Sequence, residues 1–218
     1  PQTAMLPHNM TMTVTGAAML WVGWFGFNAG SAVAADGVAG MAMLVTHISA
    51  AAGALTWMVT EWIRHGKPGA LGAVTGMVAG LGTITPASGF VGPMGALIIG
   101  TAAGFTCYWA TQLIKQKLVI DDSLDVFPVH GVGGALGMLL TAVFVSVGLG
   151  GAGYAEGVTM GSQFLVQALA VIATVIWSAL VSYVALKIAG AVVTLRVGVD
   201  EEIEGLDLVN HEERGYNL

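Results

Sequence analysis

The stretch DVFPVHGVGGALGMLLTAVFV, from Asp125 to Val145, decides the fold class of this chain. It is apolar and rich in glycine over about 20 residues, the length that an α-helix needs to cross the hydrocarbon core of a bilayer. One histidine, His130, interrupts it near its start. Because ionisable side chains are costly inside a membrane and concentrate on ion and substrate paths, His130 is the first functional candidate.

The composition of the whole chain indicates a membrane protein. Hydrophobic residues make up 56% of the 218 positions, charged residues make up 9%, and the mean hydropathy is +0.80. Soluble domains carry about 25% charged residues, so this chain has too few charges to cover a surface in water. We therefore predict an all-α polytopic membrane protein that contacts the lipid bilayer, and we expect no nucleic-acid partner.

Six apolar runs are candidate membrane spans. They are predicted at about residues 12–34, 38–63, 70–85, 93–116, 126–145 and 161–195. Together they form a predicted membrane domain over residues 1–195, which is followed by a hydrophilic tail over residues 196–218. The chain opens on Pro1 without an initiator methionine or a signal-peptide pattern, which suggests a fragment or a processed start.

The charges in the predicted loops alternate along the chain. Lys or Arg is present in the loops at residues 64–69 and 115–117, and absent from those at 30–37, 86–92 and 146–160. Because positive charges gather on the cytoplasmic side of a membrane, both ends of the chain are predicted to face the cytoplasm.

The last predicted span is unusually long, and the tail after it is acidic. A helix over residues 161–195 would be about 52 Å long against a hydrocarbon core of about 30 Å, so it must tilt, bend or project beyond the bilayer. The tail holds seven of the 13 acidic residues of the chain. Two interpretations of the tail remain open: a solvated, partly disordered end, or a docking segment for a regulator.

The chain contains 32 glycines, and many of them recur four residues apart. In lipid, small residues at this spacing allow helix backbones to approach closely. We interpret nearly all of them as packing residues of a compact bundle.

The residues before His130 predict the start of a helix. Pro128 suits the first turn, because its φ is fixed and it lacks an N–H, and Asp125 is expected to cap that turn. The positive end of the helix dipole disfavours an imidazolium, so we expect a neutral His130 ring that both donates and accepts hydrogen bonds. For His130 to reach the middle of the membrane, the loop at residues 118–127 must dip into the protein. From the residues alone, a pore or relay role and a packing role both remain open.

A second candidate site lies near the outer end of the first span, in the motif GWFGFNAGS. Trp24, Phe27 and Ser31 share one face of the predicted helix. Aromatic faces attract cations, and a serine oxygen accepts a hydrogen bond from one. The competing interpretation is an aromatic belt at the membrane interface, which the residues alone favour. His47, in mid-span, is interpreted as a hydrogen-bonded packing residue.

The sequence contains no glycine-rich phosphate loop, metal-ligand cluster or catalytic triad. We therefore expect neither an enzyme nor a bound metal or other cofactor. The single Cys107 lies inside a predicted span, so no disulfide framework is expected.

Six motifs, in order along nearly the whole chain, give it a resemblance to a known family. They are GWFGFNAGS, EWIRHGKP, GxxAGLxxxTPASGFVGPMGALIIG, DDSLDVFPVHGVGG, YAEGVTMGSQ and a terminal GLD…HEERGYN. Each motif is weak by itself, but the ordered set resembles the ammonium transporter (Amt/Mep/Rh) family. The resemblance implies a homotrimer of eleven-span subunits in the cell membrane, each with a narrow hydrophobic pore for ammonium or ammonia.

Within the family pattern, the chain corresponds to the second inverted repeat, the last helix and the cytoplasmic tail. Its six predicted spans would then form half of a pore wall. The partner histidine and the second gate phenylalanine of the family pattern have no counterpart in this sequence. We therefore expect a piece of a longer protein, or one component of a split one, that does not conduct alone.

The resemblance also implies roles for single residues. His130 is similar to one of two paired pore histidines. Phe27 is similar to one of two stacked gate phenylalanines, which replaces the aromatic-belt interpretation. Ser31 resembles part of the external ammonium recruitment site, and Trp24 resembles a pore-adjacent residue.

The fourth and the sixth motif add structural and regulatory candidates. Asp122 and Asp125 are candidate structural or pore-entry acids. In the tail, Gly205, Asp207 and Tyr216 match the family's terminal motif, and such tails cooperate with a PII-type signal protein at the cytoplasmic exits. The expected partners are therefore ammonium or ammonia, with methylammonium as an analogue, and that signal protein.

The predicted function is the transport of ammonium or ammonia across the membrane. Ammonium would be recruited and deprotonated at the outer face, because a bare charge is too costly to carry along a dry pore. The alternative on the same fold is an ammonium sensor that signals through its tail. A third hypothesis, a purely structural membrane subunit, predicts that substitution of His130 or Phe27 has no effect on transport or sensing.

Overall fold

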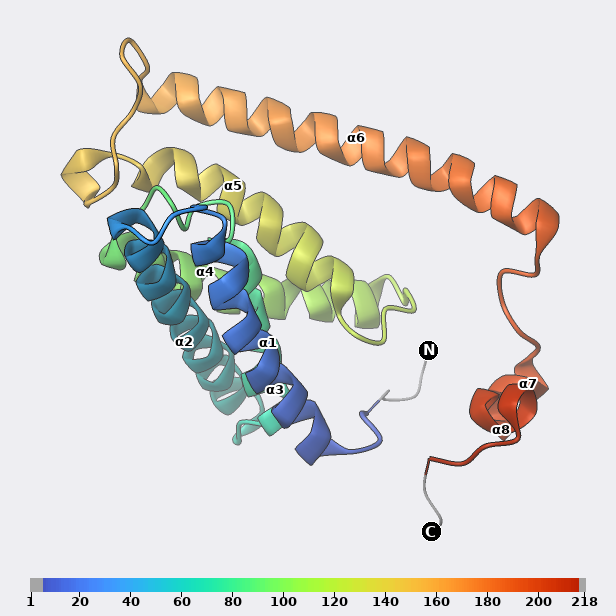
Figure 1. Cartoon of the computed structure of the whole chain (residues 1–218). Coiled ribbons are helices and arrows are strands. Elements are labelled where there is room, and N and C mark those ends of the chain that lie inside the picture. Colours follow the sequence, from blue (N-terminus) through green and yellow to red (C-terminus); the bar gives the residue numbers. More distant parts are fainter. Residues whose placement is uncertain (1–5, 216–218) are drawn as a thin grey trace. The chain divides into compact units, whose positions relative to one another are not determined.

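The computed structural model describes residues 6–215, and every regular element in that range is helical (Figure 1). The long helices are α1 (Met10–Gly30), α2 (Gly37–His65), α3 (Ala70–Ile84), α4 (Pro93–Gln112), α5 (Gly133–Phe144) and α6 (Met160–Val192). The shorter elements are the π-helices η1 (Leu113–Lys117) and η2 (Phe127–Val132), the 3-10 helix η3 (Val147–Leu149), α7 (Val199–Glu204) and α8 (Leu206–His211). The predicted all-α fold is confirmed.

The chain divides into two compact units, Pro1–Val171 and Ile172–Leu218. The first unit holds α1 to α5 and the first part of α6, and the second holds the rest of α6 with α7 and α8. All of the candidate pore residues belong to the first unit.

Helices occupy all six regions in which membrane spans are predicted. Within residues 6–215, five are long and apolar enough to cross a membrane: Met10–Gly30, Gly37–His65, Pro93–Lys117, Phe127–Phe144 and Met160–Val192. α3 is an apolar helix of 15 residues, so at about 22 Å it is shorter than the hydrocarbon core. A crossing at α3 therefore requires the turn that follows it, at residues 85–90, or a locally thinner bilayer.

Apart from the π-helical segments that adjoin α4 and α5, two helix ends differ from the prediction by three residues or more. The first helix ends at Gly30 and not at residue 34, and Asp36 begins the next one as its N-cap. One oxygen of Asp36 accepts hydrogen bonds from the backbone N–H of Val38 at 2.9 Å and of Ala39 at 3.1 Å. The last long helix ends at Val192 and not at residue 195.

Helices α2, α3 and α4 pack side by side through glycines. A Cβ on Gly80 would lie 2.2 Å from the carbonyl oxygen of Ser49, and one on Gly100 would lie 2.4 Å from the same oxygen. Ser49 is fully buried on α2, and its hydroxyl donates to the carbonyl of Gly80 at 2.8 Å. Because a side chain at either glycine would push the helices apart, both are packing residues.

Buried apolar side chains fill the space between these helices and α5. One group contains Val45, Ile84, Ala87, Val91, Ala96, Ile99 and Phe144. A second group contains Trp57, Ala79, Ala103, Cys107, Tyr108 and Val129. Because Val129 belongs to η2, the second group ties the turn before α5 to α4 and holds it in place.

Helix α6 differs from the other long helices, because none of its residues is buried. Its exposed side chains are mostly apolar, and its hydropathy is the highest of the five described helices that are long enough to cross a membrane. In a membrane, an apolar surface of this kind contacts lipid or protein. The predicted tilt, bend or projection of this helix stays a prediction.

Candidate functional site

His130 lies in η2, a π-helix that continues directly into α5. Pro128 and Val129 are buried, whereas the His130 ring is exposed. Pro128 falls in the first turn, as its fixed φ predicts. The wider π turn could not be read from the sequence, and such turns occur frequently at functional sites.

The structure brings His130 together with two residues of α1. The Trp24 ring is stacked with the His130 ring at an angle of 11°, with 6.5 Å between their centroids. The same Trp24 ring lies 5.8 Å from that of Phe27, at 52°. Three of the four predicted conduction and recruitment residues therefore form one continuous row of rings, which runs from α1 to η2.

A hydrogen bond to α3 and the turn after it fixes the central ring of this row. The indole N–H of Trp24 donates to Oγ1 of Thr85 at 2.7 Å. Thr85 in turn donates to the carbonyl of Leu81 at 2.8 Å. Thr85 could not be identified from the sequence as the partner of Trp24, because it lies 61 positions away and only the folded chain joins them.

Phe27 ends an apolar groove of about 520 Å³ along α1. The groove is lined by Gly16, Met19, Leu20, Gly23, Trp24 and Phe27. Phe27 is 63% exposed, so its ring face is open to a ligand or to another part of the protein. An apolar lining of this kind suits a small neutral molecule better than a hydrated ion.

Ser31 lies one helical turn beyond Phe27, at the end of α1. Its hydroxyl donates to the carbonyl of Phe27 at 2.5 Å. Because the proton of this hydroxyl is committed to that carbonyl, the oxygen can offer only lone pairs to a ligand. A ligand that carries N–H or O–H donors fits this requirement.

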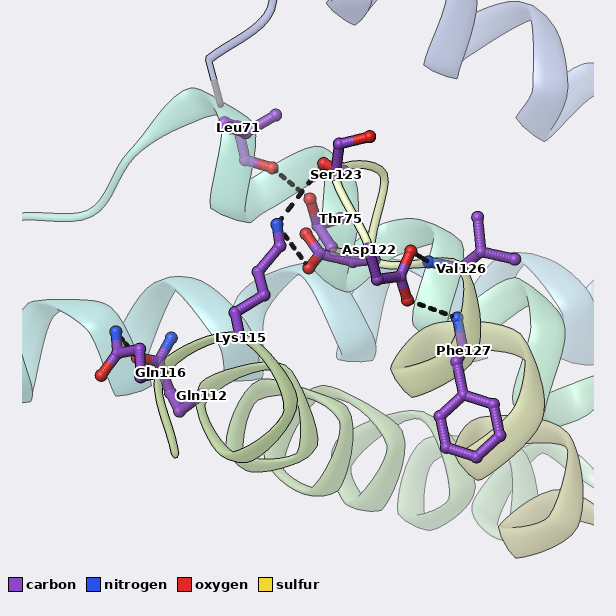
Figure 2. Close-up of polar contacts among 10 residues, drawn as sticks. Leu71, Thr75, Gln112, Lys115, Gln116, Asp122, Ser123, Val126 and Phe127 are labelled. Atoms are coloured by element: carbon purple, nitrogen blue, oxygen red, sulfur yellow. Dashed lines mark hydrogen bonds and ion pairs between the residues drawn. The ribbon is translucent and has the colours of Figure 1, made fainter. Parts of the chain in front are cut away.

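The loop before η2 corrects one prediction. Asp122, and not Asp125, provides the capping side chain: its two oxygens accept hydrogen bonds from the N–H of Val126 and of Phe127, each at 2.9 Å. Figure 2 shows the Asp122 carboxylate directed at these two amides. Asp125 does not cap the helix, because its side chain pairs with Lys115 instead.

Asp125 forms an ion pair with Lys115 of η1, which we call the loop pair. Lys115 Nζ lies 2.7 Å from Oδ1 of Asp125 and donates to the carbonyl of Ser123 at 3.4 Å. The two side chains are 26% and 16% exposed. Burial raises the pKa of Asp125, while the hydrogen bond and charge of Lys115 act to lower it and the charge of Asp122 adds to the rise.

His47 packs against aromatic rings but forms no hydrogen bond within the described residues. Its ring lies 5.1 Å from that of Trp21 and 6.1 Å from that of Phe25. The packing role that the sequence analysis assigned to His47 therefore rests on ring contacts.

Glu61 has a larger part in the fold than its place at a helix end suggests. Its carboxylate accepts hydrogen bonds from the N–H of Gly69 at 2.8 Å and from the indole N–H of Trp57 at 3.0 Å. It therefore joins the end of α2 to the start of α3. A Cβ on Gly72 would lie 2.1 Å from one of its oxygens, so only a glycine leaves space for the Glu61 carboxylate at this position.

The tail forms two short helices, α7 and α8, that meet at Gly205. The φ of Gly205 is +104°, a conformation that favours glycine, and Asp207 lies in the first turn of α8. Arg196 binds Glu202 through two hydrogen bonds of 2.7 Å and 3.1 Å, which we call the tail pair. Arg196 lowers the pKa of Glu202. Tyr216 lies outside the described residues.

The chemistry available at this site is binding and proton transfer. In the described part of the chain, no three His, Cys, Asp or Glu side chains gather as they would around a metal ion. The row of rings offers π faces, one imidazole and the Ser31 acceptor. An apolar helical bundle that carries such a row on one side has the features of a membrane transport protein.

The comparisons with known proteins agree with that class. The model of the Ammonium Transporter Family matches residues 1–216. The chain belongs to this family, and its apolar helices make it a multi-pass membrane protein. The resemblance drawn from its motifs is confirmed.

The relatives are named for transport and not for catalysis. The ammonium transporter of Bacillus subtilis is 44% identical over 216 residues, which cover 98% of this chain and 53% of the relative. Ammonium transporter Amt1 of Archaeoglobus fulgidus is 48% identical over 212 residues, which cover 96% of this chain and 53% of the relative. The chain spans about half the length of the curated relatives it matches.

Solved structures of this family share the fold. The structure titled "Sensor Amt Protein" matches with a TM-score of 0.86 and 32% identity, over 94% of this chain and 50% of that one. The Mep2 structure from Saccharomyces cerevisiae matches with a TM-score of 0.77 and 36% identity, over 88% of this chain and 48% of that one.

Proposed function

We propose that this chain forms one half of the wall of an ammonium-conducting pore, with Phe27, Trp24 and His130 along the path. The observation that carries the proposal is the row of rings, in which Trp24 lies 5.8 Å from Phe27 and 6.5 Å from His130. Membership of the Ammonium Transporter Family supports ammonium as the substrate. The rest of the wall comes from a segment equivalent to the family's first half.

Recruitment takes place at the end of α1. The Ser31 oxygen accepts a hydrogen bond from ammonium, and the exposed face of Phe27 attracts the cation through its quadrupole. Together these contacts offset part of the hydration that ammonium loses. Trp24 lies next to this site and lines the path beyond it.

Transfer along the path requires a neutral species. A bare charge in an apolar groove is costly, so ammonium releases its proton to water at the outer face, before the constriction, and ammonia continues. The neutral imidazole of His130 exchanges hydrogen bonds with ammonia as it passes. Asp122 and Asp125 act as structural acids in this scheme, because one caps the helix start and the other is held by Lys115.

The family pattern supplies the rest of the proposal. The complete protein is a homotrimer in the cell membrane, with the tail in the cytoplasm. Gly205 and Asp207 lie where α7 meets α8, and this acidic tail is a regulatory contact for a PII-type signal protein.

A second candidate function is ammonium sensing. The solved structure titled "Sensor Amt Protein" shares the fold with a TM-score of 0.86, so the same bundle serves a protein named as a sensor. A signalling domain in the same gene beyond Leu218 would favour this function. Transport is the stronger proposal, because the curated relatives are named ammonium transporters.

The test is methylammonium uptake into proteoliposomes by this chain joined to the first half of a family relative. His130→Ala should lower uptake at least about tenfold, because the imidazole positions the passing ammonia. His47→Ala is the matched control, since its ring contacts are with Trp21 and Phe25 and not with the three rings of the row. A His130→Ala protein with wild-type uptake and selectivity would remove His130 from the path.

A further inference from the structure

The loop pair connects two π-helical segments that flank one loop. Lys115 belongs to η1, and Asp125 lies two residues before η2 begins at Phe127. The π turn of η1 extends to the start of the loop, because the N–H of Leu118 donates to the carbonyl of Leu113, five residues earlier, at 2.9 Å. Within the described residues η1 and η2 are the only π-helices, and the loop pair joins one to the start of the other.

Asp125 has an unusual backbone conformation. Its φ is +55°, in the left-handed region that non-glycine residues seldom occupy, and asparagine and aspartate tolerate it best. A residue in this region needs its surroundings to hold it there. The 2.7 Å contact with Lys115 is the side-chain interaction that does so.

A short series of contacts leads from Asp125 to His130. The Asp125 carbonyl accepts a hydrogen bond from the N–H of Val129 at 3.1 Å. Val129 is 3% exposed and packs in the group that contains Cys107 and Tyr108 of α4. A shift of Asp125 therefore moves Val129, and with it the next residue, His130.

Helix α3 lies next to η2 at Gly82. A Cβ on Gly82 would lie 3.8 Å from Nδ1 of His130 and 3.8 Å from the carbonyl oxygen of Val129, which is ordinary van der Waals contact, so the glycine leaves space for about one methyl group beside them. The His130 ring is stacked with Trp24, which its hydrogen bond to Thr85 holds in place. The position of the His130 ring thus depends on where η2 begins.

The electrostatics of the loop pair favour a role in geometry over one in stability. Burial raises the pKa of Asp125 although Lys115 acts to lower it, so the ion pair does not fully offset the cost of burying the carboxylate. Pairs of this kind are retained in some proteins because they specify one arrangement.

We propose that Lys115 is a positioning residue for His130: by pairing with Asp125 it sets the start of η2, and so holds the His130 ring against Trp24. This inference rests on the proposed function. The outer site at Phe27 and Ser31 belongs to α1 and does not contact the loop pair, so loss of the pair changes passage along the row and leaves recruitment intact.

The experiment measures methylammonium transport by this chain joined to the first half of a family relative, in proteoliposomes. Lys115→Met removes the cation. Asp125→Asn removes the charge but keeps a residue that tolerates a positive φ. Lys115→Arg restores the pair. Lys117→Met is the matched control, because Lys117 also lies in η1 and makes no hydrogen bond or ion pair with the described residues.

We expect Lys115→Met and Asp125→Asn to lower the maximal rate about tenfold, since displacements of about 1 Å at a site cost up to about a hundredfold. The half-saturating concentration should stay within about twofold of wild type, as for a residue that does not bind the substrate initially. Lys115→Arg and Lys117→Met should keep the wild-type rate.

Two results would overturn the inference while the proposed function stands. One is that Lys115→Met matches Lys117→Met; the other is that the half-saturating concentration rises while the maximal rate stays unchanged. If Lys115→Met fails to assemble, the Asp125→Asn rate decides in the same way. If His130→Ala also transports at the wild-type rate, the proposed function fails first and the inference fails with it.

Discussion

The loop pair and the tail pair have the same closest contact, 2.7 Å, but lie in different surroundings. In the loop pair the side chains of Lys115 and Asp125 are 26% and 16% exposed, whereas in the tail pair those of Arg196 and Glu202 are 67% and 35% exposed. Burial raises the pKa of Asp125, and Arg196 lowers that of Glu202. Distance alone therefore does not tell what an ion pair contributes.

The difference follows from solvation. In the loop, the carboxylate has lost water and its lysine replaces only part of that hydration. In the tail, both groups keep their water and the arginine adds two hydrogen bonds. The loop pair holds the turn before His130, while the tail pair links the start of the tail to α7.

The largest expected effect comes from breaking the loop pair. Lys115→Met leaves a buried carboxylate without its cation and should lower the free energy of unfolding by about 3 kcal/mol. Arg196→Met in the exposed tail should cause a much smaller loss. Thermal unfolding of the joined protein in detergent compares the two. If the two substitutions lowered stability equally, the difference in burial would not determine what each ion pair contributes.

A double substitution separates stability from position. Lys115→Met with Asp125→Asn removes both charges, so stability should recover to within about 1 kcal/mol of wild type. Transport should stay as low as in Lys115→Met, because the pair that sets the start of η2 is still absent. Recovery of both quantities would show that the loop pair acts only through stability.

The pH dependence should have opposite signs for the two carboxyls. The stability from Asp125 is present below its unfolded pKa and is lost as the pH rises through its raised folded pKa. The stability from Glu202 is present above its unfolded pKa and is lost as the pH falls through its lowered folded pKa.

Unfolding of wild type against Asp125→Asn and against Glu202→Gln, from acid to neutral pH, measures both signs. As the pH falls through the acid range, the wild type should gain relative to Asp125→Asn and lose relative to Glu202→Gln. The same sign in both series would contradict the assignment of burial as the cause in the loop.

The smallest expected effect is that of salt. The exposed tail pair is screened at high ionic strength, so about 1 M NaCl, with a Debye length of about 3 Å, should bring the pKa of Glu202 back toward its ordinary value. The pKa of Asp125 should move less. Carbon-13 NMR of labelled carboxyl groups follows both titrations, and an equal shift would count against a protected loop pair.

Much of the fold could be predicted from the sequence. Apolar runs located all six long helices, and the spacing of Trp24 and Phe27 placed their rings on one face. Pro128 predicted the first turn before α5. These features are readable because they depend on residues within one or two helical turns of each other.

The features that the sequence did not predict depend on how the helices and loops meet in the folded chain. The partner of Trp24 is Thr85, which lies 61 positions away at the end of α3, and the partner of Asp125 is Lys115, on the other side of a loop. Asp122 replaced Asp125 as the cap because the Asp125 side chain pairs with Lys115. The π turns arise where packing and loop path override the regular helix, which no local pattern records.

The most direct test of the central claim is methylammonium uptake into proteoliposomes, for the 218-residue chain alone and for the chain joined to a family first half. If Phe27, Trp24 and His130 line one side of a pore, only the joined protein should take up methylammonium, and His130→Ala should reduce its uptake. Uptake by the short chain alone would mean that its six apolar helices close a path by themselves, and would contradict a half-built pore wall.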